Sequence, residues 1–235
     1  MAGDGSEYVG QQILGKGLVV AIDGPSGAGK STVARLAAAE LYLNYLDTGA
    51  MYRALTLYVL KQGVDPDDEP AVTELARTVP MTVEDVAHAP RVLLDGKNVT
   101  NQLHSKEVNQ AVSTVAAYPG VRAELINFQR HLIQAAVNSG RGIVAEGRDM
   151  TTVVVPGAQV RILITASEEV RKQRRAAQSG MNEDSIEERD RKDSEVNEFM
   201  EPAPGVSVID TTHMTEKQVV DQIVFMVGHA LKAEG

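Results

Sequence analysis

Short apolar runs of strand length alternate with segments of helical spacing along most of the chain. Five of these runs are typical of buried parallel strands: residues 18–22, 45–47, 142–146, 160–165 and 206–209. After the first run, apolar residues recur on one helix face at Val33, Leu36, Ala37 and Leu41. This alternation predicts an α/β fold, in which a parallel sheet carries helices on both faces.

Capping residues and glycines predict where several helices begin and end. Thr48 is expected to cap a helix that ends at Gly63, Ser167 to cap a later one, and Thr215 to form a capping box with Gln218. Further helices are expected at residues 71–79, 105–117, 120–138 and, in a highly charged segment, 183–196.

Residues 81–100 interrupt the alternating pattern. Strands are expected at Met81–Val86, Arg91–Leu94 and Lys97–Thr100, and Asp95-Gly96 is a strong two-residue hairpin signal. Antiparallel strands within a β–α alternation predict an inserted small α+β subdomain. We therefore divide the chain into a disordered tail (1–16), a core (17–63 and 104–235), an insertion (64–103) and a short helical lid within the core (171–196).

Composition narrows the class of protein. The chain has 235 residues, enough for one α/β domain with an insertion, and it contains no cysteine. A net charge of −9 argues against general nucleic-acid binding, and no apolar run is long enough to span a membrane. We expect a cytoplasmic monomer with no membrane partner, in which positive charge for anionic substrates is concentrated locally.

The most informative motif is Gly24-Pro-Ser-Gly-Ala-Gly-Lys-Ser31, which matches the phosphate-loop (P-loop) pattern G-x-x-x-x-G-K-[ST]. Its backbone N–H groups can hold phosphate oxygens of ATP, Lys30 can reach the β- and γ-phosphates, and Ser31 can ligate Mg²⁺. A strand before the loop and a helix after it argue against an incidental glycine-rich turn. The expected nucleotide-binding residues are Gly24, Pro25, Ser26, Gly27, Ala28, Gly29, Lys30, Ser31 and Thr32.

A P-loop alone is shared by kinases, motor ATPases, GTPases and transporters. The Asn-Lys-x-Asp motif of GTPases is absent, and the chain is short for a ring ATPase. A small-molecule kinase needs a second anion site opposite the P-loop. Arg53 and Arg148 follow predicted strands, whose carboxyl ends line the ligand site of an open sheet. The alternatives are a solvated helix face for Arg53 and a structural ion pair for Arg148.

Three arginines, Arg171, Arg174 and Arg175, share one helix face at spacings of three and four. We expect them to act with Lys30 and Arg148 in catalysis, on a lid that closes over ATP and excludes water. A solvated helix in which Glu168 and Glu169 neutralise them is the alternative.

The expected reaction needs a metal site but no general base. Glu146 ends a strand and could hold a Mg²⁺-bound water, so Ser31 and Glu146 are the expected metal site. No general base is required if the acceptor is a phosphomonoester, because its second pKa is about 6 and its attacking oxygen is already ionised at neutral pH.

Four motifs occur in a characteristic order: IDGPSGAGKS at residues 22–31, LDTGAMYR at 46–53, EGRD at 146–149 and RDRKDS at 189–194. This ordered set resembles bacterial cytidylate kinases over about residues 18–230. The resemblance implies a P-loop kinase that uses ATP and Mg²⁺ to convert CMP or dCMP to the diphosphate in pyrimidine nucleotide metabolism. The insertion is similar to the family's enlarged region for binding the nucleoside monophosphate (NMP).

The resemblance also implies a set of acceptor residues. Arg53 and Arg148 would bind the CMP phosphate, and Asp149 would accept a hydrogen bond from the cytosine amino group, which uracil lacks. Arg189 and Asp193 would lie on the ribose side. The full implied set is Thr48, Tyr52, Arg53, Ser113, Arg122, Arg148, Asp149, Arg189 and Asp193.

The sequence departs from the family pattern at two informative positions. Val196 stands where the family often has arginine, and Thr151 stands where glycine is common. A β-branched residue resists positive φ, so we expect a local change of backbone at Thr151. Thr48 replaces a common serine but keeps the hydroxyl. Two alternative functions stay open: another P-loop small-metabolite or nucleoside monophosphate kinase, and a non-catalytic nucleotide-binding regulatory protein.

Overall fold

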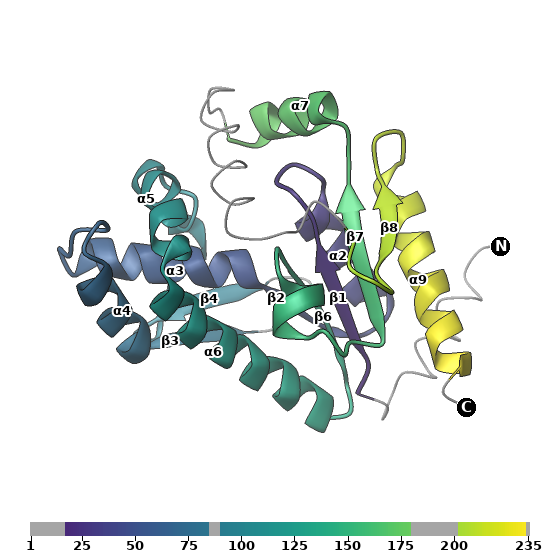
Figure 1. The fold of residues 1–235 in the computed structure, drawn as a ribbon, viewed down its shortest axis with the longest axis horizontal. Coiled ribbons are helices and arrows are strands. Elements are labelled where there is room, and N and C mark those ends of the chain that lie inside the picture. Colours follow the sequence, from purple (N-terminus) through teal and green to yellow (C-terminus); the bar gives the residue numbers. More distant parts are fainter. Residues whose placement is uncertain (1–16, 85–89, 180–201, 234–235) are drawn as a thin grey trace.

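A five-stranded parallel sheet forms the centre of the molecule (Figure 1). The structure is a computed structural model, and it describes residues 17–84, 90–179 and 202–233. The sheet is ordered β2-β6-β1-β7-β8. Its strands are β1 (Val19–Asp23), β2 (Asn44–Asp47), β6 (Ile143–Gly147), β7 (Val160–Thr165) and β8 (Ser207–Asp210). The five predicted strands are confirmed, with small shifts at their ends.

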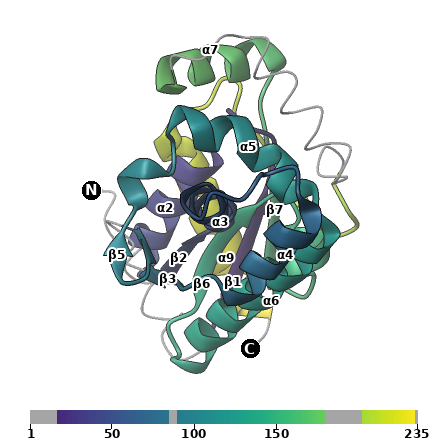
Figure 2. The same ribbon diagram turned by 90° about the vertical axis from the view of Figure 1, so that its left-hand side faces the viewer.

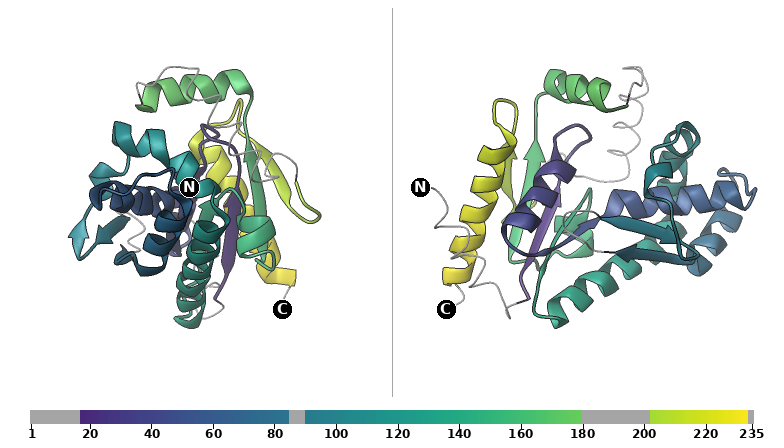
Figure 3. Two further views of the ribbon diagram at one scale, coloured as in Figure 1. Left: turned by 60° about the vertical axis from the view of Figure 1, so that its left-hand side comes forward. Right: turned by 180° about the vertical axis from the view of Figure 1, so that it is seen from behind.

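Alternating side chains of the strands pack into two separate cores. In β1, Val20 and Ile22 face the helices α2 (Lys30–Glu40) and α9 (Glu216–Ala233), which lie side by side (Figure 3). Val19 and Ala21 face the opposite core, which includes α3 (Thr48–Lys61) and α6 (Pro119–Asn138). This period of two is the expected pattern for a strand that is buried on both faces.

The predicted antiparallel strands form a small sheet, and this sheet packs against α3. It contains β3 (Met81–Glu84), β4 (Arg91–Leu94) and β5 (Lys97–Asn98). Asp95 and Gly96 both have positive φ, at 51° and 71°, which is the backbone of a type I′ hairpin turn. β5 is shorter than predicted, because Thr100–Gln102 forms a 3₁₀ turn in which the Thr100 hydroxyl accepts from Val92 N at 3.0 Å.

The other described α-helices lie outside the main sheet and the helices that cover it (Figure 2). They are α4 (Glu69–Thr78) and α5 (Lys106–Ala117) beside α3 and α6, and α7 (Glu168–Ser179), which follows β7 and lies beyond the P-loop. A single π-helical turn, Met150–Val154, follows β6. The predicted helix at 183–196 and the tail at 1–16 lie outside the described residues, as does most of the predicted lid.

The predicted cap at Thr48 is wrong. The capping residue is Asp47, whose carboxylate accepts from Ala50 N at 2.9 Å. Thr48 is the first helical residue, and its hydroxyl donates instead to the Glu146 backbone oxygen at 2.8 Å. Asp47 has the extended backbone that capping requires, because it still belongs to strand β2. The caps at Ser167 and Thr215 are confirmed by their hydrogen bonds.

Candidate active site

The P-loop connects β1 to α2 at the carboxyl edge of the sheet (Figure 1). Gly24 has a φ of 149°, and a Cβ there would lie 2.0 Å from the Ile164 backbone oxygen of the neighbouring strand. Gly29 has a φ of 90° and immediately precedes α2. The loop can therefore take this path only with glycine at these positions, and the path aims the N-terminus of α2 at the site.

Lys30 folds back over the loop. Its Nζ donates to the Pro25 backbone oxygen at 3.0 Å. Burial lowers the pKa of Lys30, the carboxylate of Glu146 opposes that shift, and the nearby Arg148 guanidinium adds to it. Its amine is thus held inside the loop, where an anionic phosphate would restore its preference for the charged form.

Ser31 and Glu146 meet beside the P-loop. The Ser31 hydroxyl donates to Glu146 Oε1 at 2.6 Å, and Tyr45 Oη donates to the same oxygen at 3.4 Å. Glu146 is only 3% exposed. Burial raises its pKa, Asp47 raises it further, and Lys30 acts in the opposite direction. These closely spaced oxygens are the ligand type that Mg²⁺ takes from a protein alongside phosphates and water.

Asp149 and Arg122 form a largely buried ion pair at the start of α6. Arg122 Nη2 lies 2.6 Å from Asp149 Oδ2, with side-chain exposures of 18% and 9%. Burial raises the pKa of Asp149, and Arg122 counteracts this shift. The pair presents one hydrogen-bond acceptor and one fork of donors in the same place, which suits recognition of a polar ring.

Tyr52 and Gln129 lie next to this ion pair. Burial raises the pKa of the Tyr52 hydroxyl, Asp149 raises it further, and Arg122 lowers it. Neither the hydroxyl nor the Gln129 carboxamide makes a hydrogen bond within the part of the chain that the structure describes. Gln129 is 1% exposed. Buried polar side chains without a hydrogen-bond partner are rare in folded proteins, and this one lies beside Tyr52.

Arg53 is anchored between α3 and the start of α5. Its Nη1 donates to the Leu103 backbone oxygen at 2.9 Å and to Asn109 Oδ1 at 2.7 Å, and the residue is 8% exposed. Arg148, directly after β6, is close enough to Lys30 to lower the pKa of its amine. The structure thus places Arg148 beside the P-loop and Arg53 in the α3–α5 layer.

Two of the α7 arginines reach down to the P-loop. Arg171 Nη1 donates to the Ser26 backbone oxygen at 3.3 Å. Arg174 Nη1 donates to the Ala28 backbone oxygen at 3.5 Å, and its guanidinium also donates to Thr211 Oγ1 and the Thr211 backbone oxygen, both at 2.9 Å. Glu168 pairs with Lys172 at 3.0 Å. The side chain of Arg175 lies outside the described residues.

The structure brings most of the predicted site together and leaves the rest apart. The P-loop, Glu146 and Arg148 form one group, and Tyr52, Arg122 and Asp149 form another. Ser113 is half-buried on α5 and makes no hydrogen bond to either group in the part of the chain that the structure describes. The Thr48 hydroxyl is bonded to the backbone of β6. Arg189, Asp193 and Val196 lie outside the described residues.

Sequence reasoning missed several polar residues around the site. Three of them end or follow strands at the carboxyl edge: Asp23, Asp47 and Thr211. The sequence could have indicated these three residues. Each is an acid or hydroxyl at the end of a buried strand, which is the pattern that identified Glu146. Asn109 and Gln129 carried no such signal, since each is one polar residue on an amphipathic helix.

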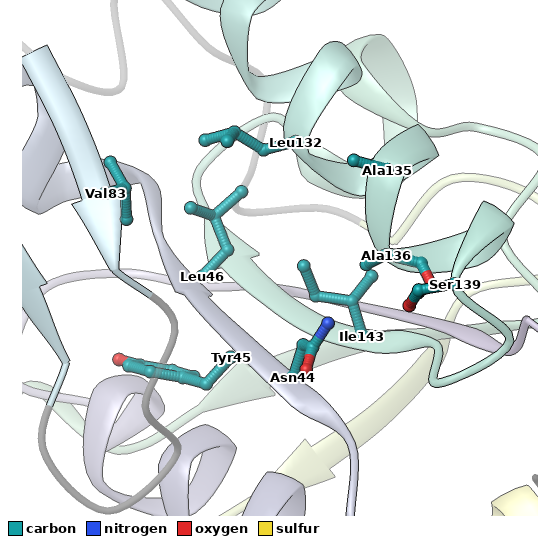
Figure 4. Close-up of a pocket in the computed structure, with 9 residues that line it drawn as sticks. All are labelled: Asn44, Tyr45, Leu46, Val83, Leu132, Ala135, Ala136, Ser139 and Ile143. Atoms are coloured by element: carbon teal, nitrogen blue, oxygen red, sulfur yellow. The ribbon is translucent and has the colours of Figure 1, made fainter.

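A pocket outside this site lies along the edge strand β2 (Figure 4). It has a volume of about 270 Å³, and its lining includes Leu46, Val83, Leu132 and Ile143. None of the predicted site residues lines it. This largely apolar pocket is therefore separate from the polar site described above.

Comparisons with known proteins point to one family. Residues 20–229 match the family model described as cytidylate kinase. A cytidylate kinase of Limosilactobacillus reuteri is 47% identical over 220 residues, covering 88% of this chain and 94% of that protein. A bifunctional pantoate ligase/cytidylate kinase of a Synechococcus strain is 43% identical over 230 residues, and the match covers 92% of this chain but 42% of that protein's length.

A solved structure supports the fold alone. A gluconokinase from Sinorhizobium meliloti superposes with a TM-score of 0.51 at 13% identity, covering 94% of this chain and 96% of that one. The described residues contain no helix that is both long and apolar enough to cross a membrane.

Two glycine substitutions test the geometry of the loop. In Gly24→Ala, the added methyl group would overlap the Ile164 backbone oxygen, so we expect a loss of at least about 2 kcal/mol of unfolding free energy. Gly157→Ala is the control, because nothing lies within 4 Å of a Cβ there. Thermal unfolding of both variants checks this. Equal melting temperatures for the two would contradict the described path of the loop.

Proposed function

The chain belongs to the cytidylate kinase family and is an ATP-dependent phosphotransferase, and we propose that its paired arginine and aspartate select CMP or dCMP as the acceptor. The observation that carries this proposal is the Arg122–Asp149 ion pair. Asp149 directly follows Arg148 and the strand β6, which pairs with β1, the strand before the P-loop. Family membership supplies the reaction, and this pair supplies a physical reason for its base selectivity.

The P-loop forms the donor half of the proposed site. Its backbone N–H groups and the N-terminus of α2 would hold the phosphates of ATP, and Lys30 would move from Pro25 O to the transferring phosphate. Arg171 and Arg174 approach the same loop from α7. Their guanidinium groups would neutralise charge that develops on the equatorial oxygens of that phosphate.

Magnesium fits the residues beside the loop. Ser31 Oγ and Glu146 Oε1, 2.6 Å apart, could hold the ion directly or through water. In the described residues no cluster of three His, Asp or Glu side chains forms a metal site by itself, so phosphate oxygens would have to complete the shell. Held by Ser31 and Glu146, Mg²⁺ would supply positive charge that neutralises the donor phosphates.

The acceptor half would lie between β6, α3 and α6. Arg148 and Arg53 are the proposed cations for the CMP phosphate. Asp149 would accept from the cytosine N4 amino group, and Arg122 would donate to the ring acceptors. Uracil would place a carbonyl against the Asp149 carboxylate, leaving two acceptors facing each other in a buried site. Tyr52 and Ser113 are proposed to border the same pocket.

Phosphoryl transfer then needs alignment and charge neutralisation and no general base. The acceptor phosphate is largely ionised at neutral pH, and the two anionic groups must be held in line against their repulsion. Lys30 and Arg148 would do this together, since they lie close enough for the guanidinium to lower the pKa of the amine. The proposed lid, 171–196, would close the site against water, and the insertion at 64–103 would close on the monophosphate.

Further features of the function stay predictions: a cytoplasmic location, a monomeric state, and no nucleic-acid partner. The absence of cysteine from the sequence and its net charge of −9 support the first and third of these.

An acceptor screen tests the proposed substrate. Initial rates of ADP formation are measured with CMP, dCMP, UMP, AMP and no acceptor, with and without Mg²⁺. We expect CMP and dCMP to exceed UMP and AMP in kcat/KM by roughly tenfold or more. Equal values for CMP and UMP would overturn base selection. ATP binding without turnover on any monophosphate would favour the regulatory alternative.

Replacing Asp149 by asparagine tests the base-reading role. Asparagine keeps the shape but adds an N–H₂ donor that can serve a uracil carbonyl, so we expect the CMP/UMP ratio of kcat/KM to fall roughly 10- to 100-fold. The KM for ATP should stay within about twofold. Asp67→Asn, at an exposed position in the insertion, is the matched control. Parallel losses on all acceptors in the Asp149 variant would count against this role.

Replacing Lys30 by alanine tests the donor site. Lys30 is proposed to stabilise charge that appears in the transition state, so we expect kcat to fall by roughly 100-fold or more. Lys61→Ala removes an exposed lysine whose side chain bonds to Gln102, and it should leave kcat unchanged. A Lys30 variant with the parental kcat would refute the assignment of the loop.

A further inference from the structure

The carboxylate of Asp23 receives three hydrogen bonds from one segment far away in the sequence. Met150 N donates to Oδ1 at 2.8 Å, while Thr151 N and Thr151 Oγ1 donate to Oδ2 at 2.7 and 2.6 Å. All three contacts are buried, with Asp23 2% and Thr151 4% exposed. Burial raises the pKa of Asp23, and the bonds from Thr151 and Met150 lower it.

These bonds join the two halves of the proposed site. Asp23 is the last residue of β1 and directly precedes Gly24 of the P-loop. Met150 and Thr151 directly follow Arg148 and Asp149. Asp23 also lies opposite Gly147 in the parallel register of β1 and β6. The pairing of β1 with β6 therefore brings Asp23 to the segment after β6. The residues just before Met150, Arg148 and Asp149, are the proposed acceptor-binding residues.

The anchor also explains why Asp149 is available to Arg122. Asp149 occupies the capping position of the π-helical turn Met150–Val154, yet its side chain makes no capping hydrogen bond. An aspartate at a helix start ordinarily accepts from the first backbone N–H groups of that helix. Here Asp23 accepts from those groups, so the Asp149 carboxylate can point to Arg122 Nη2 at 2.6 Å.

Thr151 has a role in this arrangement that glycine could not fill. Its φ is not positive, since the positive-φ residues other than glycine in the described ranges are Tyr42 and Asp95. The residue therefore needs no glycine-like backbone, and its hydroxyl supplies the shortest of the three bonds to Asp23. A glycine at this position would lack that donor.

We propose that Asp23 and Thr151 are positioning residues for cytosine selection: they cap the turn after Asp149 and so hold its carboxylate toward the base. This inference rests on the proposed function, because it needs Asp149 to contact the acceptor. It extends that function by two residues that touch neither nucleotide and act through the turn. In this proposal Asp23, which directly precedes the P-loop, also fixes the turn that follows Asp149.

The test compares three substitutions at neighbouring threonines. Thr151→Val removes the hydroxyl and keeps the shape, Thr151→Ser keeps the hydroxyl, and Thr152→Val makes the same change at the next, exposed residue. For each variant, kcat and KM are measured with CMP, UMP and ATP, together with the melting temperature.

We expect the CMP/UMP ratio of kcat/KM to fall roughly tenfold in Thr151→Val, mainly through the KM for CMP, with the KM for ATP unchanged. Thr151→Ser and Thr152→Val should keep the parental ratio within about twofold. A lower melting temperature in Thr151→Val with an unchanged CMP/UMP ratio would show that the bonds only stabilise the fold, and would overturn the proposal.

A second variant keeps the test decisive if valine at Thr151 impairs folding. Asp23→Asn replaces one acceptor oxygen by an N–H₂ group that faces donors, so it should lower the same ratio. In the double variant the two effects should be less than additive, because they break the same bond. Full additivity would contradict the proposal.

The Asp149→Asn variant separates the two levels of inference. If that substitution leaves the CMP/UMP ratio unchanged, the proposed role of Asp149 itself is wrong. If it lowers the ratio while Thr151→Val and Asp23→Asn do not, the base-reading role stands and only the positioning role is overturned.

Discussion

The parallel register of β1 with β6 is the constraint on which the site depends. It sets Asp23 opposite Gly147 and Ile22 opposite Glu146, so the end of the strand before the P-loop lies beside the end of the strand before Arg148. Because parallel strands finish at the same edge, every loop that carries chemistry begins there. The pairing of β2 with β6 adds Asp47 opposite Glu146 in the same row.

This edge concentrates ionisable groups that are costly to bury singly. Asp23, Glu146 and Asp149 are each at most 6% exposed. Each has partners that offset its desolvation: backbone and hydroxyl donors for Asp23, Lys30 and Ser31 for Glu146, and Arg122 for Asp149. A chain with a net charge of −9 thus presents cations where anionic nucleotides would bind. The same pairing keeps side chains oriented before any ligand arrives, which is what alignment of two phosphates requires.

Features that depend only on residues close together in the sequence were the easiest to predict. The P-loop, the Asp95-Gly96 hairpin and the capping box at Thr215 each depend on a few neighbouring residues, and all three occur where expected. The cap of α3 shows the limit of local reasoning. Thr48 and Asp47 are both good capping residues. Asp47 caps the helix, because the Thr48 hydroxyl donates instead to the Glu146 carbonyl of β6. No local pattern reports that carbonyl.

The sequence by itself determined the alternation of strands and helices, the phosphate-binding loop, and a family resemblance that the comparisons confirm. The first two follow from periodicity and from backbone demands that only glycine meets, and the resemblance follows from the four motifs in their order. Tertiary structure alone decided which polar groups meet across the chain. Asp23 and Thr151 are 128 residues apart, and Arg122 and Asp149 are 27 apart. Their partners were settled by strand order and register, because a buried charge must find its donors wherever the sheet brings them.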